Sequence, residues 1–202
     1  NHNDTAPVSL TCTIDKAYCS FTAFPISVTD LVYNGTAQEL LIAGAVSGGT
    51  LKYSMDGTAW DTVIPTAVDA GSYLVYCKVF GDENHKDSIH ICFQVIIGKA
   101  DGSATAPTAV NGLTYNGTEQ ALINAGSTST GTMKYSTNGT DWSEEAPKKS
   151  TAGTHVVYYK VFGDANHNDT EIASLSVQIA KADSRVATVP IPVTGLVYDG
   201  TA

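Results

Sequence analysis

The sequence predicts an all-β protein built from tandem β-sandwich domains of about 80 residues, arranged end to end. The composition favours strands and tight turns, because glycine and tyrosine are abundant and threonine and valine recur throughout the 202 residues. No segment keeps the apolar spacing of three and four residues that an amphipathic helix requires. The chain also repeats itself at an interval of 82 or 83 residues, which indicates one domain used more than once.

Two motifs mark this repeat. Tyr-Asn-Gly-Thr begins at Tyr33 and Tyr115 and returns as Tyr-Asp-Gly-Thr at Tyr198. An Asn-His pair begins at Asn1, Asn84 and Asn166. A unit of this length has the size of a small independent domain and is too long for a solenoid repeat.

The repeat predicts four segments, and the chain is expected to be cut from a longer array, out of phase with its repeats. These segments are the last strand of a preceding repeat (1–21), a first complete β-sandwich repeat (22–102), a second complete repeat (103–184), and the first strands of a following repeat (185–202). Each junction carries a short Lys-Ala-Asp sequence with little room for a flexible linker. Neighbouring repeats are therefore expected to dock end to end with limited bending.

Within each repeat, strand and turn signals alternate roughly every 8–12 residues, which is typical of a sandwich. A first strand ends in the Asn-Gly turn at Asn34, and two hairpins follow with Asp56-Gly57 and Asn138-Gly139 as expected two-residue type I′ turns. Long strands rich in valine and tyrosine are predicted over 70–80 and 152–162. The final strands are predicted over 89–97 and 172–180.

One of these strands is similar to a strand of immunoglobulin domains. The sequence from Asp69 to Cys77 resembles the Asp-x-Gly-x-Tyr-x-Cys pattern, with Tyr73 at the corner tyrosine and Val75 at the place of the disulfide cysteine. The second repeat departs from the pattern at Thr151 and His155. The resemblance therefore implies an Ig-like architecture without the antibody-type signature.

The whole repeat resembles the tandem Ig-like and MBG-type ("mostly β") repeats of bacterial cell-surface proteins. The matching pieces are Tyr-Asn-Gly-Thr, the Lys-Tyr-Ser-x-(Asp/Asn)-Gly-Thr-x-Trp hairpin, Ala-Gly-x-x-x-Val-Tyr and Gly-Asp-x-Asn-His. The resemblance implies export, display on the cell surface, and a role in spacing, adhesion or glycan contact. It supplies no catalytic residues, and the chain is expected not to be an enzyme.

The net charge of the chain disfavours some classes of binding partner. The net charge is −9 and Arg185 is the single arginine, so the chain would repel the phosphates of nucleic acid. No apolar run approaches the roughly 20 residues that span a bilayer, so no membrane insertion is expected in this segment. The expected partners are the adjacent repeats of the same chain, together with a glycan or a host or surface protein.

The Asn-His segments offer the first candidate site. "VFGDENHKDS" (79–88) and "VFGDANHNDT" (161–170) carry oxygen ligands that a calcium ion accepts. The candidate ligands are Asp82, Asn84, Asp87, Asp164, Asn166 and Asp169. The favoured alternative is a turn between the last two strands, in which these side chains satisfy their own backbone. No other cofactor is expected.

Aromatic residues on the hairpins offer a second candidate site, for stacking on a sugar ring. The candidates are Trp60, Trp142, Tyr53 and Tyr135. The favoured alternative is that each anchors the core of its repeat, because a small sandwich with one tryptophan usually needs it for packing.

The four cysteines do not follow the repeat. If the turn at 79–88 is symmetric, Cys77 lies opposite Cys92 and a cross-strand disulfide is possible. Side-chain alternation does not settle this register: Cys77 shares a face with Val75 and Val79, whereas Cys92 shares one with His90 and Gln94. The disulfide therefore stays one alternative, and Cys12 and Cys19 are expected to be free or are left unassigned.

No catalytic signature stands out. The sequence has no Gly-x-Ser-x-Gly nucleophile elbow, no histidine in a base-and-nucleophile signature, and no glycine-rich phosphate loop before a helix. The acids that recur do so in turns, where solvation is the common reason for a carboxylate.

Overall fold

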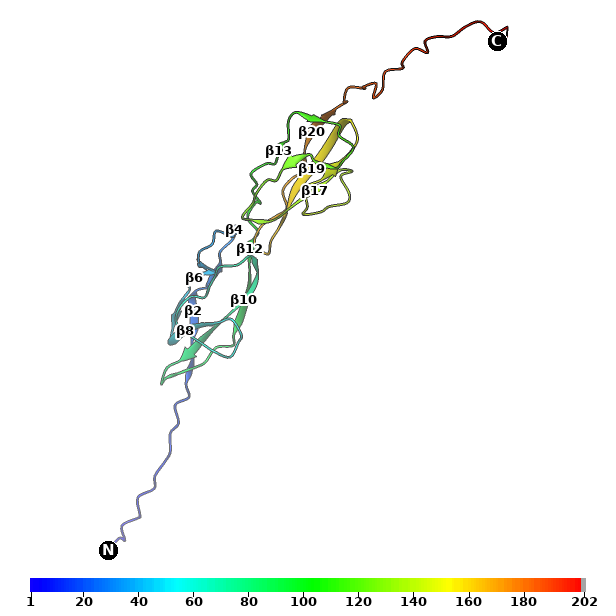
Figure 1. Cartoon of the computed structure of the whole chain (residues 1–202). Coiled ribbons are helices and arrows are strands. Elements are labelled where there is room, and N and C mark those ends of the chain that lie inside the picture. The colour runs from blue at the N-terminus through cyan, green and yellow to red at the C-terminus, as the bar shows by residue number, and fades with distance from the viewer. Residues whose placement is uncertain (201–202) are drawn as a thin grey trace. The chain divides into compact units, whose positions relative to one another are not determined.

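The computed structural model describes residues 1–200, and all of the regular secondary structure in that range is β-strand (Figure 1). The chain divides into two compact units. Unit 1 comprises residues 1–103, 128–132 and 161–170, and unit 2 comprises 104–127, 133–160 and the residues from 171 onward. The all-β prediction is confirmed, whereas the four sequence segments remain a prediction.

The main sheet of unit 1 has four strands in the order β4-β12-β10-β8, which are Leu31–Val32, Ile91–Gly98, Gly71–Gly81 and Gly49–Ser54. β10 pairs antiparallel with β12 and with β8, and β4 pairs parallel with β12. The central strand β10 buries alternate residues, Val75, Cys77 and Val79, as the period of two in a strand requires. That alternation places one face of β10 in the core.

Four small two-stranded sheets complete unit 1. They pair β1 (Ala17–Tyr18) with β11 (His85–Lys86), β2 (Ser20–Ala23) with β7 (Ala45–Ser47), β3 (Ile26–Ser27) with β6 (Leu41–Ile42), and β5 (Gln38–Glu39) with β9 (Thr66–Ala67). The β1–β11 pair is parallel and the others are antiparallel. The core places the fully buried Leu40 and Leu41 in one cluster with Val75 and Val95 of the main sheet. These apolar contacts are the main source of stability.

Unit 2 has a similar four-stranded sheet, in the order β14-β20-β19-β17. Its strands are Leu113–Thr114, Ala173–Ala180, Gly153–Gly163 and Gly131–Ser136, and residues at the start of β17 and the end of β19 are counted in unit 1. Two small sheets pair β13 (Thr108–Ala109) with β16 (Ile123–Asn124) and β15 (Gln120–Ala121) with β18 (Lys148–Lys149). Each strand of the main sheet has a counterpart in unit 1. The two similar sheets indicate two repeated β domains.

An irregularity in unit 1 accounts for one change of the interval, from 83 residues to 82. Lys99 follows Lys16 by 83 residues, whereas Pro107 follows Pro25 by 82. The register of the β2–β7 pair shifts between Phe21 and Ala23, as at a β-bulge. A bulge holds one extra residue in a strand, so this position takes up the insertion without disturbing the rest of the fold.

The predicted type I′ turns are wrong. A type I′ turn needs positive φ at both central residues, but Asp30 is the one non-glycine residue in the range 1–200 with positive φ. The bridge between Tyr53 and Asp61 closes a longer loop instead. Asp56 Oδ1 accepts hydrogen bonds from the N–H groups of Thr58 (2.7 Å) and Ala59 (2.8 Å). This side-chain cap stabilises the wider loop.

The Cys77–Cys92 disulfide, which the sequence left as one alternative, does not form, because the register differs by one residue. Cys77 lies opposite Ile91, and Cys92 lies opposite Tyr76. Cys77 is fully buried while Cys92 is exposed, so the two side chains lie on opposite faces of the sheet. Both are free thiols, as are Cys12 and Cys19, and burial raises the pKa of Cys77 to about 12.

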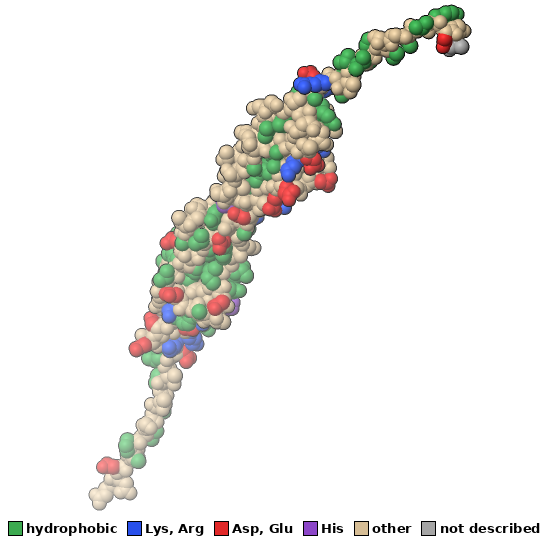
Figure 2. Space-filling model, in the orientation of Figure 1, with side chains coloured by type: hydrophobic (Ala, Val, Ile, Leu, Met, Phe, Trp, Pro, Cys, Tyr) green, Lys and Arg blue, Asp and Glu red, His purple; other side chains and the backbone are tan. Residues whose placement is uncertain are grey.

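The terminal segments differ from each other. Of the predicted last strand over 1–21, only β1 and the start of β2 form, and both pair inside unit 1. Residues 185–200 form no strand within the described part of the chain, and Figure 2 shows hydrophobic side chains along this segment. The prediction for residues 201 and 202 lies outside the described residues. Residues 1–200 contain no helix with the length and apolar character needed to cross a bilayer.

Candidate functional site

The two Asn-His turns are built by the same internal hydrogen bonds. We call residues 79–88 the first turn and residues 161–170 the second turn. In the first, Asp82 Oδ1 accepts the N–H of Asn84 (2.8 Å) and lies 2.6 Å from His85 Nδ1. In the second, Asp164 Oδ1 makes the same two contacts, both at 2.8 Å, with Asn166 and His167. Each aspartate therefore organises the turn that follows it.

A second aspartate and a glycine close each turn. Asp87 Oδ1 accepts the N–H of Gly81, and Asp169 Oδ1 accepts the N–H of Gly163, both at 2.9 Å. A Cβ atom at Gly81 would lie 2.3 Å from the carbonyl oxygen of His85, and one at Gly163 would be 2.2 Å from that of His167. Glycine is therefore needed because the backbone passes too close for any side chain.

These contacts set the ionisation of the turn carboxylates. The side chain of His85 and the N–H of Asn84 hold the pKa of Asp82 below its usual range. The equivalent groups of His167 and Asn166 lower the pKa of Asp164 in the same way. In both turns, hydrogen bonding to the charged form is the cause.

Each turn also holds a strand that approaches it through a Lys-Ala pair. At the first turn, Lys16 Nζ donates to the carbonyl oxygen of Asp82 (3.1 Å) and the N–H of Ala17 donates to that of Asn84 (2.9 Å). At the second turn, Lys99 Nζ donates to the carbonyl oxygen of Asp164 (2.7 Å) and the N–H of Ala100 to that of Asn166 (2.9 Å). The paired segments run parallel in both places.

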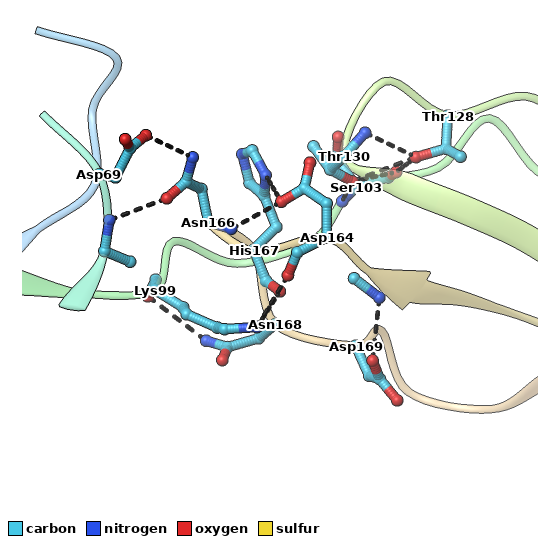
Figure 3. A network of polar contacts seen from close by, with 12 residues as sticks. Asp69, Lys99, Ser103, Thr128, Thr130, Asp164, Asn166, His167, Asn168 and Asp169 are labelled. Atoms are coloured by element: carbon cyan, nitrogen blue, oxygen red, sulfur yellow. Dashed lines mark hydrogen bonds and ion pairs between the residues drawn. The ribbon is translucent and has the colours of Figure 1, made fainter.

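The second turn makes further contacts within unit 1 (Figure 3). The N–H of Ala70 donates to Asn166 Oδ1 (2.8 Å), and Asn166 Nδ2 donates to Asp69 Oδ1 (3.0 Å). The His167 ring meets the Tyr33 ring edge-on, with centroids 5.2 Å apart. The side chains of Asn166 and His167 are thus both engaged by residues from far earlier in the chain.

A small hydroxyl cluster lies in the same network (Figure 3). The carbonyl oxygen of Ser103 accepts from Thr128 Oγ1 (2.6 Å) and Thr130 Oγ1 (3.1 Å). The N–H of Ser103 donates to Thr130 Oγ1 (2.8 Å), whose residue is buried. The cluster fixes the backbone just after the Lys-Ala pair, because both polar groups of Ser103 are satisfied.

The predicted calcium ligands do not converge. Asp82, Asp87, Asp164 and Asp169 each bind backbone groups of their own turn, and Asn166 binds Asp69 and Ala70, while Asn84 is exposed. Across residues 1–200, no three His, Cys, Asp or Glu side chains gather as metal ligands would. This geometry is that of a hydrogen-bonded turn, the alternative that the sequence favoured.

The aromatic candidates separate into buried and half-buried groups. Tyr53 and Tyr135 are 4% and 3% exposed, so these two rings pack in the core, the alternative that the sequence favoured, and cannot stack on a sugar. Tyr135 OH accepts the N–H of Gly126 (2.9 Å), and burial raises the pKa of Tyr53. Trp60 and Trp142 are half-buried and keep part of their surface accessible.

Trp60 belongs to an aromatic and cationic cluster on unit 1. Its ring meets Phe80 edge-on, with centroids 5.7 Å apart. The ammonium groups of Lys52 and Lys78 lie 5.1 Å and 4.7 Å from the Phe80 centroid, and Lys78 also pairs with Asp87 at 2.9 Å. These cation–π contacts hold the lysine stems over the ring.

Sequence reasoning missed Asp69 and Ala70, which lie almost a hundred residues before their partner Asn166. The Lys-Ala-Asp sequence that contains Lys99 was expected at a domain junction, but the bond from Lys99 to the second turn was not predicted. One signal could have revealed the strand contact, because a Lys-Ala pair recurs at the same place in every repeat (16–17, 99–100 and 181–182).

Compared with models of known protein families and with curated proteins, the chain shows no match. The resemblance to bacterial surface repeats therefore remains a prediction from the quoted motifs.

Proposed function

We propose that this chain is a non-enzymatic repeat segment of a bacterial cell-surface or secreted protein and acts as a structural spacer or stalk with adhesive contacts. The observation that carries the proposal is the repeated bond between a Lys-Ala pair and an Asp-x-Asn-His turn. In both turns the aspartate side chains hold the turn's own backbone, and the carbonyl oxygens that they position hold the incoming strand. Such a use suits a mechanical role.

The proposal includes an Ig-like sandwich for each repeat. Tyr73 OH donates to the carbonyl oxygen of Asp69 (2.7 Å), which is how a corner tyrosine binds backbone a few residues upstream. In the second repeat His155 Nε2 lies 2.8 Å from the carbonyl oxygen of Thr151, so the histidine replaces the tyrosine in the same contact. These two bonds support the immunoglobulin resemblance in both repeats.

The proposed location is extracellular, and the proposed partners are adjacent repeats of the same chain, together with a glycan or a host or surface protein. The acidic net charge of −9 disfavours nucleic acid, as the sequence indicated. The compact cores support a load-bearing role, because long antiparallel pairings such as β10–β12 must break together when the ends are pulled.

Single-molecule stretching tests the mechanical role. With handles at both ends, each repeat is expected to unfold in one event that releases about 280 Å of contour, given about 80 residues at 3.5 Å each. Repeated pulling should show refolding between cycles. Extension without any force peak would contradict the spacer proposal, because a stalk of this kind must resist load.

The alternative function is carbohydrate binding at the aromatic cluster of unit 1. Trp60 is half-buried beside Phe80 and two lysines, so part of an indole face is open next to cationic side chains. A glycan array is expected to show hits that Trp60→Ala abolishes and Cys92→Ser, an exposed change elsewhere on unit 1, leaves intact. An array without hits would remove this alternative while leaving the spacer proposal untouched.

A further inference from the structure

A cavity of about 450 Å³ lies beside the first turn in unit 1. Its walls are residues 14–17 on one side and Glu83, Asn84 and His85 on the other. At the second turn, Asp69 and Ala70 contact Asn166, and Tyr33 contacts His167. The two turns otherwise share their internal bonds.

We propose that this cavity is the docking site for another repeat of this chain's own type. The incoming repeat would present the equivalents of three residues, Asp69, Ala70 and Tyr33. Its acceptor side chain would take the Asn84 Nδ2 hydrogen, its backbone N–H would donate to Asn84 Oδ1, and its aromatic ring would cover the His85 edge.

The polar part of this inference rests on the exposed Asn84 amide. An amide has two donors and an acceptor, and Asn166 uses both kinds of group at once through Asp69 and Ala70. Asn84 offers the same pair of groups from the equivalent turn, but it is exposed whereas Asn166 is half-buried. A two-point hydrogen bond of this kind is specific, because it needs an acceptor and a free N–H in consecutive residues.

The aromatic part rests on the histidine. The His85 side chain is 30% exposed and the His167 side chain is 17% exposed, although both lie against the equivalent aspartate. Tyr33 accounts for the extra cover of His167. A tyrosine recurs at this place in each Tyr-(Asn/Asp)-Gly-Thr motif, so every repeat of this type can supply the ring.

The acceptor in the partner need not be a carboxylate. In the second repeat Thr151 stands where the first repeat has Asp69, and its hydroxyl can accept from an amide as a carboxylate does. The exposed Glu83 replaces Ala165 next to the amide, so a hydroxyl acceptor would avoid like-charge repulsion at the first turn. The inference rests on the repeat-array part of the proposed function and does not depend on cellular location.

An extended chain tests the docking site. The extended chain consists of an added copy of residues 1–96 followed directly by residues 14–202. The added copy supplies a second Asp69, Ala70 and Tyr33 ahead of the original first turn. The original Lys16-Ala17 segment still connects the added copy to that turn. Amide hydrogen exchange is measured at both Ala70 residues, the original one serving as the internal reference because its N–H is bound to Asn166. The matched variants are Asn84→Ala at the original first turn and Asn166→Ala at the second turn.

The added Ala70 amide is expected to be protected like the original. Asn84→Ala should speed its exchange about five-fold or more, while Asn166→Ala should act only on the original Ala70 amide. Fast exchange at the added Ala70, with the original still protected, would overturn the docking site and leave the spacer proposal standing. Fast exchange at both would also remove the contact that supports a repeat array.

Discussion

The first and second turns are two copies of one device in different surroundings. Both have the glycine, both aspartates, the asparagine and the histidine, and both hold a Lys-Ala strand by the same two bonds. They differ in the side chain of the asparagine, which is exposed in Asn84 and bound to Asp69 and Ala70 in Asn166. The difference separates two roles of the turn. The shared internal bonds shape the local chain, and the asparagine side chain can also bind residues from far away in the sequence.

The comparison also explains why the turns resemble a metal site in sequence. Aspartate and asparagine are calcium ligands, but they are also the residues that best accept hydrogen bonds from neighbouring backbone N–H groups. Here the carboxylates lie against N–H groups two and six residues away. The close spacing of aspartate and asparagine in these segments is thus explained by the hydrogen bonds that form the turn.

The largest effect is expected when a side chain is added at the glycine of each turn, where the backbone passes closest. Gly81→Ala and Gly163→Ala should each lower the free energy of unfolding by about 2–4 kcal/mol, because the new Cβ meets a backbone carbonyl that cannot move easily. Denaturant titration measures the change. Gly98→Ala is the control, since its Cβ would meet only Leu31 at an ordinary 3.5 Å. Very different costs at the two turns would show that they are not equivalent.

Removal of the asparagine amide should affect the stability of the chain differently at the two turns. Asn166→Ala should cost about 1–2 kcal/mol because it breaks two hydrogen bonds and leaves the N–H of Ala70 without its acceptor. Asn84→Ala should change stability by no more than about 0.5 kcal/mol, as is usual for an exposed side chain. Equal costs in denaturant titrations of the two variants would contradict the assigned roles.

Acid should weaken both turns together. The folded-state pKa of Asp82 and of Asp164 is depressed, so each carboxylate contributes stability that is fully present above the ordinary aspartate pKa of about 4 and is lost as the pH falls below it. Thermal unfolding between about pH 5 and pH 2 should therefore show a falling midpoint. The double variant Asp82→Asn, Asp164→Asn should flatten that fall, and an unchanged slope would contradict the prediction.

Calcium should have the smallest effect. A site with a dissociation constant of about 0.1 mM would add about 2.7 kcal/mol at 10 mM calcium. Because the turn oxygens already bind backbone N–H groups, the midpoint of thermal unfolding is expected to be the same with 10 mM calcium and with chelator. A clear rise with calcium, absent with magnesium, would restore the metal interpretation of the turns.

Most of the long strands could be predicted from the sequence. The turn type at Asp56-Gly57 and Asn138-Gly139 and the register between β10 and β12 could not. The long strands over 70–80 and 152–162 and the final strands agree with β10, β19, β12 and β20 to within a few residues. The two-residue turn predicted at Asp56 was wrong because the Asp56 side chain caps the N–H groups of Thr58 and Ala59 and so stabilises a wider loop. The Cys77–Cys92 register failed because β10 pairs with β12 over its first half and with β8 over its second.

The aromatic residues show a similar limit. Tyr53 and Trp60 lie on one hairpin, and sequence alone could not separate them because both suit a core and a binding surface. The structure buries Tyr53 and leaves Trp60 half-buried against Phe80. Only the packing of β8 and its loop decides which ring is covered.

The period of the repeat, the all-β class and the turn built from Gly81, Asp82 and Asp87 can be read from the sequence. The bonds of that turn join residues no more than nine positions apart, so the local chain encodes them. The bond from Asn166 to Asp69 and the position of β10 between β12 and β8 are visible only in the folded chain. Such contacts join residues far apart in the chain, and their formation depends on which surfaces the folded core brings together after the entropy of loop closure has been overcome.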